Sequence, residues 1–275
     1  MTRFRIGHTG ITWGYGSKEA EQAVKDTAEL GYCAYETFGS VLVEYEQNVP
    51  GGFGAILKRY GIPLSAAYCW TEFYDPANAQ LDIDRVLGWA RVAAKLGAEA
   101  IVLQAGKRSE SHYPYFKEMG EIFTNIGREA QAMGMITAIH PHTGTIIETR
   151  VEIDAILHAV DPALVGFAPD TGQIAKGGSD PVATLRDYKA MLKHVHLKDW
   201  GGGRETGYAD YEPIGSGVVD MAGVFQVFEE ADYQGWVMVE LDGTKTSPRP
   251  PREAAAMSKA YLEKLLGDKA IWAKR

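Results

Sequence analysis

The sequence predicts an α/β fold, a single (β/α)8 TIM barrel, and three observations lead to this prediction. Eight short apolar or β-branched runs recur along the 275 residues. Stretches with apolar residues at helical spacing lie between these runs. The chain also has about the length, roughly 250 residues, that is typical of a closed barrel of this kind. The predicted strands are Phe4–Gly7, Tyr32–Phe38, Leu64–Trp70, Ala100–Gln104, Ile136–His142, Leu164–Asp170, His194–Lys198 and Trp236–Leu241.

A predicted helix follows most of these strands. Glycine stands at the end of several helical stretches, as Gly31, Gly61, Gly97 and Gly134 do, and a glycine there is the usual helix stop. Consecutive predicted strands start 28 to 42 residues apart, which is room for one strand, one helix and two loops. The predicted helices lie at or near Ala20–Leu30, Ile83–Leu96, Tyr115–Met133, Glu152–Val160, Pro181–Leu192, Met221–Ala231 and Arg252–Leu266.

Eight such units favour a closed barrel over an open, doubly wound sheet. The first strand also runs into Gly7-His8-Thr9-Gly10, which lacks the third glycine of a dinucleotide-binding turn. No linker or low-complexity block interrupts the alternation. We therefore expect one domain over residues 1–275.

The composition is typical of a globular protein that acts on small molecules. Hydrophobic residues make up 45% of the chain and charged residues 23%, and the net charge is −8. An acidic balance disfavours nucleic acid as a partner, because a phosphate backbone requires a basic surface. No apolar run is long enough for a membrane span, and no signal peptide is evident, so we expect a cytoplasmic protein without membrane contact. A homo-oligomer is compatible with these features. The two cysteines, Cys33 and Cys69, lie in apolar runs and are interpreted as buried hydrophobic residues.

Polar residues gather at the carboxyl ends of the predicted strands, where a barrel places its active site. Strand five ends in two histidines two residues apart, and residues at that spacing project to the same side of a strand. The later strands end in an aspartate, a histidine and a glutamate. Together, imidazole and carboxylate groups suit a divalent ion such as Mn²⁺, Co²⁺, Zn²⁺ or Fe²⁺. The candidate ligands are His140 or His142, Asp170, His196 and Glu240.

Each of these residues also has a simpler structural interpretation. Asp170 precedes Thr-Gly and is typical of a turn or a helix cap. One of His194 and His196 fits a buried core histidine, and Glu240 fits an exposed strand end. Their joint position on four successive strand ends is what favours the metal site.

Five stretches of the sequence resemble the xylose isomerase-like (β/α)8 barrels, the group that includes inosose dehydratase, ketose 3-epimerases, dehydroshikimate dehydratase and, more distantly, endonuclease IV. The pattern of HxHLKD followed by GxGVVD is most similar to the inosose dehydratase-like branch. The N-terminal half matches mainly in its strand–helix rhythm. The matching stretches are His140–Thr145, Asp170–Gln173 with Gly177–Pro181, His194–Asp199, Gly215–Asp220 and Gly235–Asp242.

The resemblance implies one divalent ion held by Glu, Asp, His and Glu from strands five to eight, with Mn²⁺ or Co²⁺ favoured over Zn²⁺, Fe²⁺ and Mg²⁺. By position, the last three ligands are Asp170, His196 and Glu240. The first position is His140, which is a histidine where the family has a glutamate. His140, His142 and Glu148 therefore remain alternatives for the strand-five ligand.

The resemblance also implies an acid or base and a substrate pocket. His142 becomes the acid/base candidate, Lys198 is expected to hold a substrate oxygen, and Glu36 is a second acid/base or a hydrogen-bond partner for a hydroxyl. The glycine-rich loop 201–208 is placed to close over the substrate. The residues expected to contact substrate are Trp13, Tyr68, Trp70, Gln104 and Glu148.

The expected substrate is a keto-sugar or keto-cyclitol, from which the base removes the proton α to the carbonyl while the metal stabilises the resulting enediolate. Loss of a β-hydroxyl then gives dehydration, which is the first expectation and makes the protein a lyase. Reprotonation instead gives an isomerase or epimerase. A non-catalytic sugar-binding or accessory subunit and an abasic-site endonuclease are lower-ranked alternatives. The endonuclease would need several metals and extra His and Asp ligands on early strands, but only His8 lies there, His112 falls in a loop, and the net charge is −8.

Overall fold

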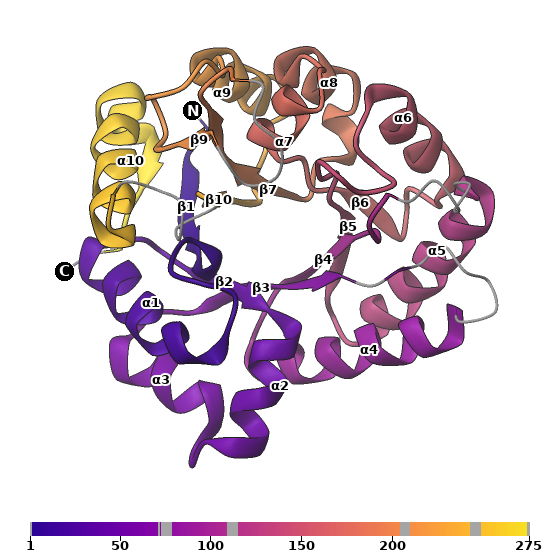
Figure 1. Cartoon of the computed structure of the whole chain (residues 1–275), viewed down its shortest axis with the longest axis horizontal. Helices are drawn as coiled ribbons and strands as arrows, with labels where there is room; N and C mark the ends of the chain where they lie inside the picture. The colour runs from indigo at the N-terminus through magenta and orange to yellow at the C-terminus, as the bar shows by residue number, and fades with distance from the viewer. Residues whose placement is uncertain are drawn as a thin grey trace.

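Eight parallel strands form the inner ring of the structure, and helices surround them (Figure 1). The structure is a computed structural model that describes residues 2–70, 72, 79–108, 115–203, 210–242 and 249–273. The ring confirms the predicted TIM barrel. Its strands are β1 (Phe4–Thr9), β2 (Tyr35–Phe38), β3 (Leu64–Trp70), β4 (Ala100–Gln104), β5 (Ile136–Ile139), β6 (Val165–Phe167), β7 (His194–Leu197) and β10 (Trp236–Val239).

The hydrogen-bonded order of the ring is β6-β5-β4-β3-β2-β1-β10-β7. Two isolated bridges, Phe167 with Leu192 and Asp170 with His196, connect β6 to β7 and close the ring. Short strands lie outside it: β11 (Ala270–Ile271) extends the sheet next to β1, and β8 (Asp199–Trp200) forms a hairpin with β9 (Tyr211–Glu212).

The helices lie where the periodicity places them, and the structure adds some that it did not predict. The second β/α unit contains two helices, α2 and α3, and a short helix, α7, follows β6 directly. Asp180 and Asp220 cap the starts of α8 and α9 with their carboxylates. The helices are α1 (Ser17–Leu30), α2 (Gly39–Asn48), α3 (Gly52–Tyr60), α4 (Ala79–Lys95), α5 (Phe116–Ala132), α6 (Arg150–Ala159), α7 (Thr171–Lys176), α8 (Pro181–Asp187), α9 (Met221–Glu230) and α10 (Pro251–Leu266).

Two of the apolar clusters among the described residues bear on the shape of the barrel. The larger one packs the helices against the outside of the sheet and includes fully buried Phe53, Phe123 and Phe228. A smaller cluster of small side chains from neighbouring strands packs beneath Tyr68. Tyr68 lines the cavity described below, and alternate strand residues share a face, so this cluster forms the floor of that cavity. Its members are Ala66, Ala100, Val102, Ala138 and Ala168.

The prediction that strand five continues to His142 is wrong, because β5 ends at Ile139. The His140 amide still donates to the Leu103 carbonyl at 2.8 Å, but the His142 amide donates to Ile147 in the following loop at 2.9 Å. Strand alternation therefore does not bring the two histidines together. The turn after the strand does, and their ring centroids lie 5.9 Å apart.

Among the described residues, we find no helix with both the length and the apolar character needed to cross a membrane. The two cysteines are free, Cys69 being buried and Cys33 partly buried.

The packing inside β1 leads to a prediction about two glycines. A Cβ added at Gly7 would lie 2.5 Å from Met238 Sδ and 2.9 Å from the Ala34 carbonyl oxygen. We expect Gly7→Ala to lower the free energy of unfolding by about 1–3 kcal/mol, because the barrel interior has no space for the methyl group. Gly88 in α4 has no atom within 4 Å of such a Cβ, so Gly88→Ala should raise it by about 0.5–1 kcal/mol. Urea denaturation of both variants measures the difference, and equal effects would contradict the packing argument.

Candidate active site

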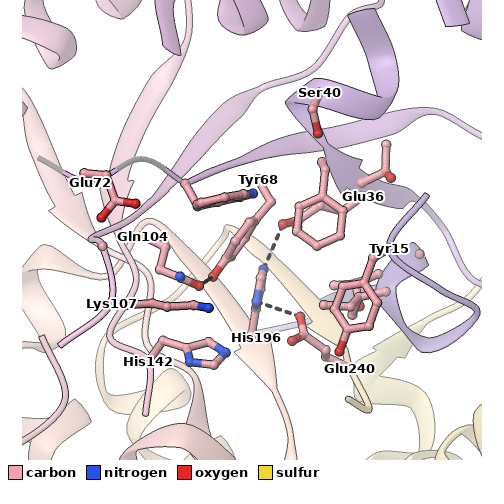
Figure 2. Close-up of a pocket in the computed structure, with 17 residues that line it drawn as sticks. Tyr15, Glu36, Ser40, Tyr68, Glu72, Gln104, Lys107, His142, His196 and Glu240 are labelled. Atoms are coloured by element: carbon pink, nitrogen blue, oxygen red, sulfur yellow. Dashed lines mark hydrogen bonds and ion pairs between the residues drawn. The ribbon is translucent and has the colours of Figure 1, made fainter. Parts of the chain in front are cut away.

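A cavity of about 500 Å³ lies at the carboxyl ends of the strands. It is the place where the sequence predicts the site, and Figure 2 shows its side chains converging from several strands. Aromatic side chains and three carboxylates share its wall with one lysine. The predicted site residues that line it are Glu36, Tyr68, Trp70, Gln104, His142, His196 and Glu240.

A fully buried lysine holds three carboxylates beside this cavity. Lys198 Nζ lies 2.9 Å from Asp170 Oδ2, 2.6 Å from Glu240 Oε1 and 2.6 Å from Asp242 Oδ2. Although burial lowers the pKa of Lys198, these carboxylates outweigh it and raise the pKa well above its usual value. Burial by itself raises the pKa of Glu240. The positive charges of Lys198 and His196 outweigh burial and hold the pKa well below the usual range. Lys198 is therefore an ammonium group that donates hydrogen bonds and cannot act as a base.

Asp170 responds differently to the same lysine. Burial raises the pKa of its carboxyl to about 6, against the lowering effect of Lys198. Its Oδ1 accepts a hydrogen bond from the Gln173 amide at 2.9 Å and caps α7, so the helix-cap interpretation of Asp170 also holds. The other oxygen, Oδ2, remains directed at the site.

His196 lies between two carboxylates. Its Nε2 is 2.8 Å from Glu36 Oε1, and its Nδ1 is 2.8 Å from Glu240 Oε2, as the dashed lines in Figure 2 show. Burial lowers the pKa of His196, but the two carboxylates raise it well above the usual value.

Glu36 is shared by two histidines of β7. Its Oε2 lies 2.7 Å from His194 Nε2, and its Oε1 is the partner of His196. Burial alone raises the pKa of Glu36, but the charges and hydrogen bonds of His196 and His194 lower it to about 2. Glu36 therefore stays ionised near neutral pH, which does not suit a general acid. His194 was not selected from the sequence, although its spacing to His196 on the same strand face could have identified it.

His140 is the residue whose surroundings most favour a metal ion. It is completely buried, and neither of its ring nitrogens has a hydrogen-bond partner among the residues that the structure describes. Burial and the nearby His196 and His142 hold its pKa well below the usual value, so it is neutral and its lone pair is available. One ligand atom each from His140, Asp170 and His196 lie within 4.8 Å of one another. Mixed nitrogen and oxygen donors of this kind fit a divalent ion.

His142 has a hydrogen-bonded environment of its own. Its Nδ1 lies 2.8 Å from the Thr143 carbonyl, which accepts only from an N–H, so Nε2 carries the lone pair. The Gln173 side-chain amide donates to this Nε2 at 3.0 Å and to Asp242 at 3.0 Å. Burial also lowers the pKa of His142. The result is a neutral imidazole at the cavity wall with a defined tautomer.

Gln173 and Asp242 were missed in the sequence. Gln173 accepts through Oε1 from Tyr211 and from Thr143, which fixes the orientation of its amide. Asp242 follows Glu240 by two residues, just after β10. This spacing of two residues, which places side chains on the same side of an extended chain, could have identified Asp242. No local sequence pattern distinguishes Gln173.

Two of the predicted substrate contacts lie elsewhere. The indole of Trp13 donates to Asp26 Oδ2 at 2.9 Å, and Trp13 is not among the residues found to line the cavity. Glu148 Oε2 accepts from the Gly144 amide at 3.0 Å and lies 3.5 Å from Arg108 Nε. Of the three alternatives for the strand-five ligand, Glu148 thus has partners outside the site.

Lys198, expected to hold a substrate oxygen, is likewise absent from the cavity lining, because its ammonium group is enclosed by carboxylates. In the loop 201–208, residues 204–208 lie outside the described residues, as does His112.

The model of one protein family, described as "Xylose isomerase-like TIM barrel", matches residues 24–265. The chain belongs to this family. A curated relative, an inosose dehydratase of Geobacillus kaustophilus (strain HTA426), is 30% identical over 300 residues, which cover 96% of this chain and 95% of the relative.

Solved structures show the same fold. The apo form of 3-keto-D-glucoside 4-epimerase, YcjR, from E. coli has a TM-score of 0.71 at 19% identity and covers 95% of this chain and 100% of its own. The IOLI protein with a binding zinc atom has a TM-score of 0.77 at 16% identity, with 95% and 98% covered.

The enclosed ammonium group leads to a stability prediction. Lys198→Met should lower the free energy of unfolding by about 3–5 kcal/mol, because it leaves Asp170, Glu240 and Asp242 close together without their counter-charge. Lys269→Met is the control, since it removes a partly exposed pair with Glu229 and should cost less than about 1 kcal/mol. Urea denaturation in the presence of a chelator measures both. Similar losses for the two variants would show that the buried cluster does not depend on Lys198.

Proposed function

We propose that this chain is a divalent-metal-dependent lyase that dehydrates a keto-cyclitol or keto-sugar. The family membership and the full-length inosose dehydratase relative support a carbohydrate-acting enzyme. The observation that carries the proposal is the pairing, in one buried centre, of two neutral histidines with different environments. Neither ring nitrogen of His140 has a hydrogen-bond partner among the described residues, and His142 lines the cavity with its Nε2 lone pair accepting from the Gln173 amide.

The residues that would hold the ion are His140, Asp170, His196 and Glu240. Two carboxylates and two imidazoles would leave a divalent ion near neutral overall, which reduces the cost of burying its charge. When bound, the ion supplies Lewis-acid polarisation of a carbonyl oxygen. Mn²⁺ and Co²⁺ are our first choices, and Zn²⁺, Fe²⁺ or Mg²⁺ are alternatives. Asp170 and Glu240 also pair with Lys198, whose third partner, Asp242, lies outside this ligand set.

His142 is the proposed base. Its Nε2 would take the proton from the carbon next to the carbonyl, in exchange for the hydrogen bond that it receives from Gln173. The imidazolium would then give this proton to the departing β-hydroxyl, which leaves as water and returns His142 to its starting form. A lowered pKa keeps His142 in the unprotonated form that the first step needs.

The cavity wall suits an uncharged polyhydroxylated ring. Tyr68 and Trp70 offer apolar faces, while the Gln104 amide and Lys107 offer hydrogen-bond donors. The Tyr68 hydroxyl donates to Gln104 Oε1, which fixes the amide with its nitrogen free to donate. Aromatic faces with a few directed polar groups are typical of sugar-binding sites.

We expect the protein loaded with Mn²⁺ or Co²⁺ to convert a keto-inositol into an enone, which a new ultraviolet absorption band reports. Removing the ion with a chelator should abolish the band, and adding it back should restore it. His142→Asn should slow the reaction by about 100- to 10,000-fold, because the base is lost. His158→Asn is the control, since His158 lies on the exposed face of α6 and should have no effect.

The same experiment in D₂O separates the alternatives. Exchange of the α-proton with solvent without an enone band would identify an epimerase or isomerase instead. Neither exchange nor an enone with keto-inositol and 3-keto-glucose would contradict the proposed reaction.

A further inference from the structure

Glu36 spans the barrel interior between strands that are not neighbours. It lies on β2, whereas its partners His194 and His196 lie on β7, and β1 and β10 separate these two strands in the sheet. The sheet hydrogen bonds therefore do not fix the distance between Glu36 and the histidines. All three side chains are almost completely buried. The Glu36 carboxylate therefore connects β2 to β7 directly across the barrel interior.

Each oxygen of Glu36 accepts one imidazole N–H, from His196 at 2.8 Å and from His194 at 2.7 Å. With both oxygens held, the carboxylate cannot rotate without breaking a hydrogen bond to an ionised acceptor, the strong kind. The Tyr68 ring also stacks on the His196 imidazole, with centroids 5.8 Å apart and planes inclined by 24°. The orientation of the His196 ring is thus fixed from its edge and from its face.

The contact determines which ring nitrogen of His196 faces the candidate ligands. Because Nε2 donates to Glu36, an ion can be bound only through Nδ1. Nδ1 lies on the side of Glu240, at 2.8 Å from Oε2, which is itself a candidate ligand. A histidine that donates through one nitrogen to a carboxylate and offers the other to a metal is a recurrent way of orienting a ligand.

We infer that Glu36 is a positioning residue: it holds His196 across the barrel so that Nδ1 points at the metal-binding centre, and His194 holds Glu36 in turn. This inference rests on the proposed metal-dependent function. It replaces the expectation that Glu36 acts as a second acid or base. Three buried residues from two opposite strands thereby form a rigid support for one ligand.

The direct test is the affinity for Co²⁺, measured by competition with a chelating dye and by the visible absorption of the bound ion. Glu36→Gln should weaken Co²⁺ binding about 10- to 100-fold and alter the absorption bands, as losing such a partner typically does. His194→Asn leaves the Glu36 charge in place and should have a smaller effect in the same direction. It also provides a second test if Glu36→Gln fails to fold.

Asp26→Asn is a matched control. Asp26 is a buried carboxylate that also bridges several donors, Trp13 Nε1, Gln22 Nε2 and Arg252, but it lies on α1 outside the barrel. Its variant should lose stability without a change in Co²⁺ affinity. Unchanged affinity and spectrum in folded Glu36→Gln would overturn the inference.

The number of Co²⁺ ions bound per chain tests whether Glu36 is instead a metal ligand itself. Ligand atoms of Glu36, His194 and His196 also lie within 4.8 Å of one another, close enough to bind an ion directly. One Co²⁺ per chain in the wild type supports the positioning role. Two per chain, falling to one in Glu36→Gln, would make Glu36 a ligand and overturn it.

A readout without metal separates this inference from the proposed function. Nitrogen-15 NMR of the metal-free protein should show Nε2–H protons of His194 and His196 far downfield, and Glu36→Gln should move them upfield. If these signals are present but the wild type binds no divalent ion, the metal-dependent function fails and the contact has no ligand to position. If the wild type binds Co²⁺ and these signals are absent, only the positioning role fails.

Discussion

The open end of the barrel depends on the buried ammonium group of Lys198. Lys198 follows β7, and its three partners follow the strands on either side, Asp170 after β6 and Glu240 and Asp242 after β10. Carboxylates this close together in a buried place repel one another strongly unless a cation lies between them. One lysine therefore allows the two strands beside β7 to end in acidic residues at the same point.

The same charges divide the histidines of the site into two kinds. Burial lowers the pKa of all three, but Glu36 and Glu240 outweigh it at His196 and raise its pKa, whereas the pKa values of His140 and His142 stay below the usual value. The difference does not come from the residues themselves, since all three are buried histidines at the same end of the barrel. It comes from the balance between burial and the carboxylates in contact with each ring.

The sequence predicts the barrel well because its signals are local. Strands β3 and β4 have the predicted limits, and the helices α1 and α5 lie within a few residues of theirs, since periodicity and glycine stops depend only on nearby residues. The short helix α7 was not predicted, because six residues are too few to show helical spacing. The end of β5 was placed too late because the strand was extended beyond its last apolar residue, Ile139, to include His140 and His142.

The site could be predicted in part, for a related physical reason. Topology alone brings strand ends together, so residues such as Asp170 and Glu240 could be selected before any contact was known. The partner of Glu36 could not be, since 158 and 160 residues separate it from His194 and His196. Trp13 shows the limit of position alone: it follows a strand, but its hydrogen bond to Asp26 directs the indole toward α1. Position in the sequence indicates the end of the barrel at which a residue lies, and side-chain partners decide which way it faces.

The closure of the ring has a consequence for how the protein opens. Every other neighbouring pair of barrel strands forms a parallel ladder, whereas β6 and β7 are joined in the described chain by isolated bridges, one of which pairs Asp170 with His196. Because so few backbone hydrogen bonds join β6 to β7, the barrel would open locally between these two strands first. Amide hydrogen exchange would then be faster there than between the other barrel strands. Both residues of that bridge are also candidate ligands. A ligand bound by both side chains would connect the two edges of the sheet. Ligand binding and closure of the barrel would then be thermodynamically linked.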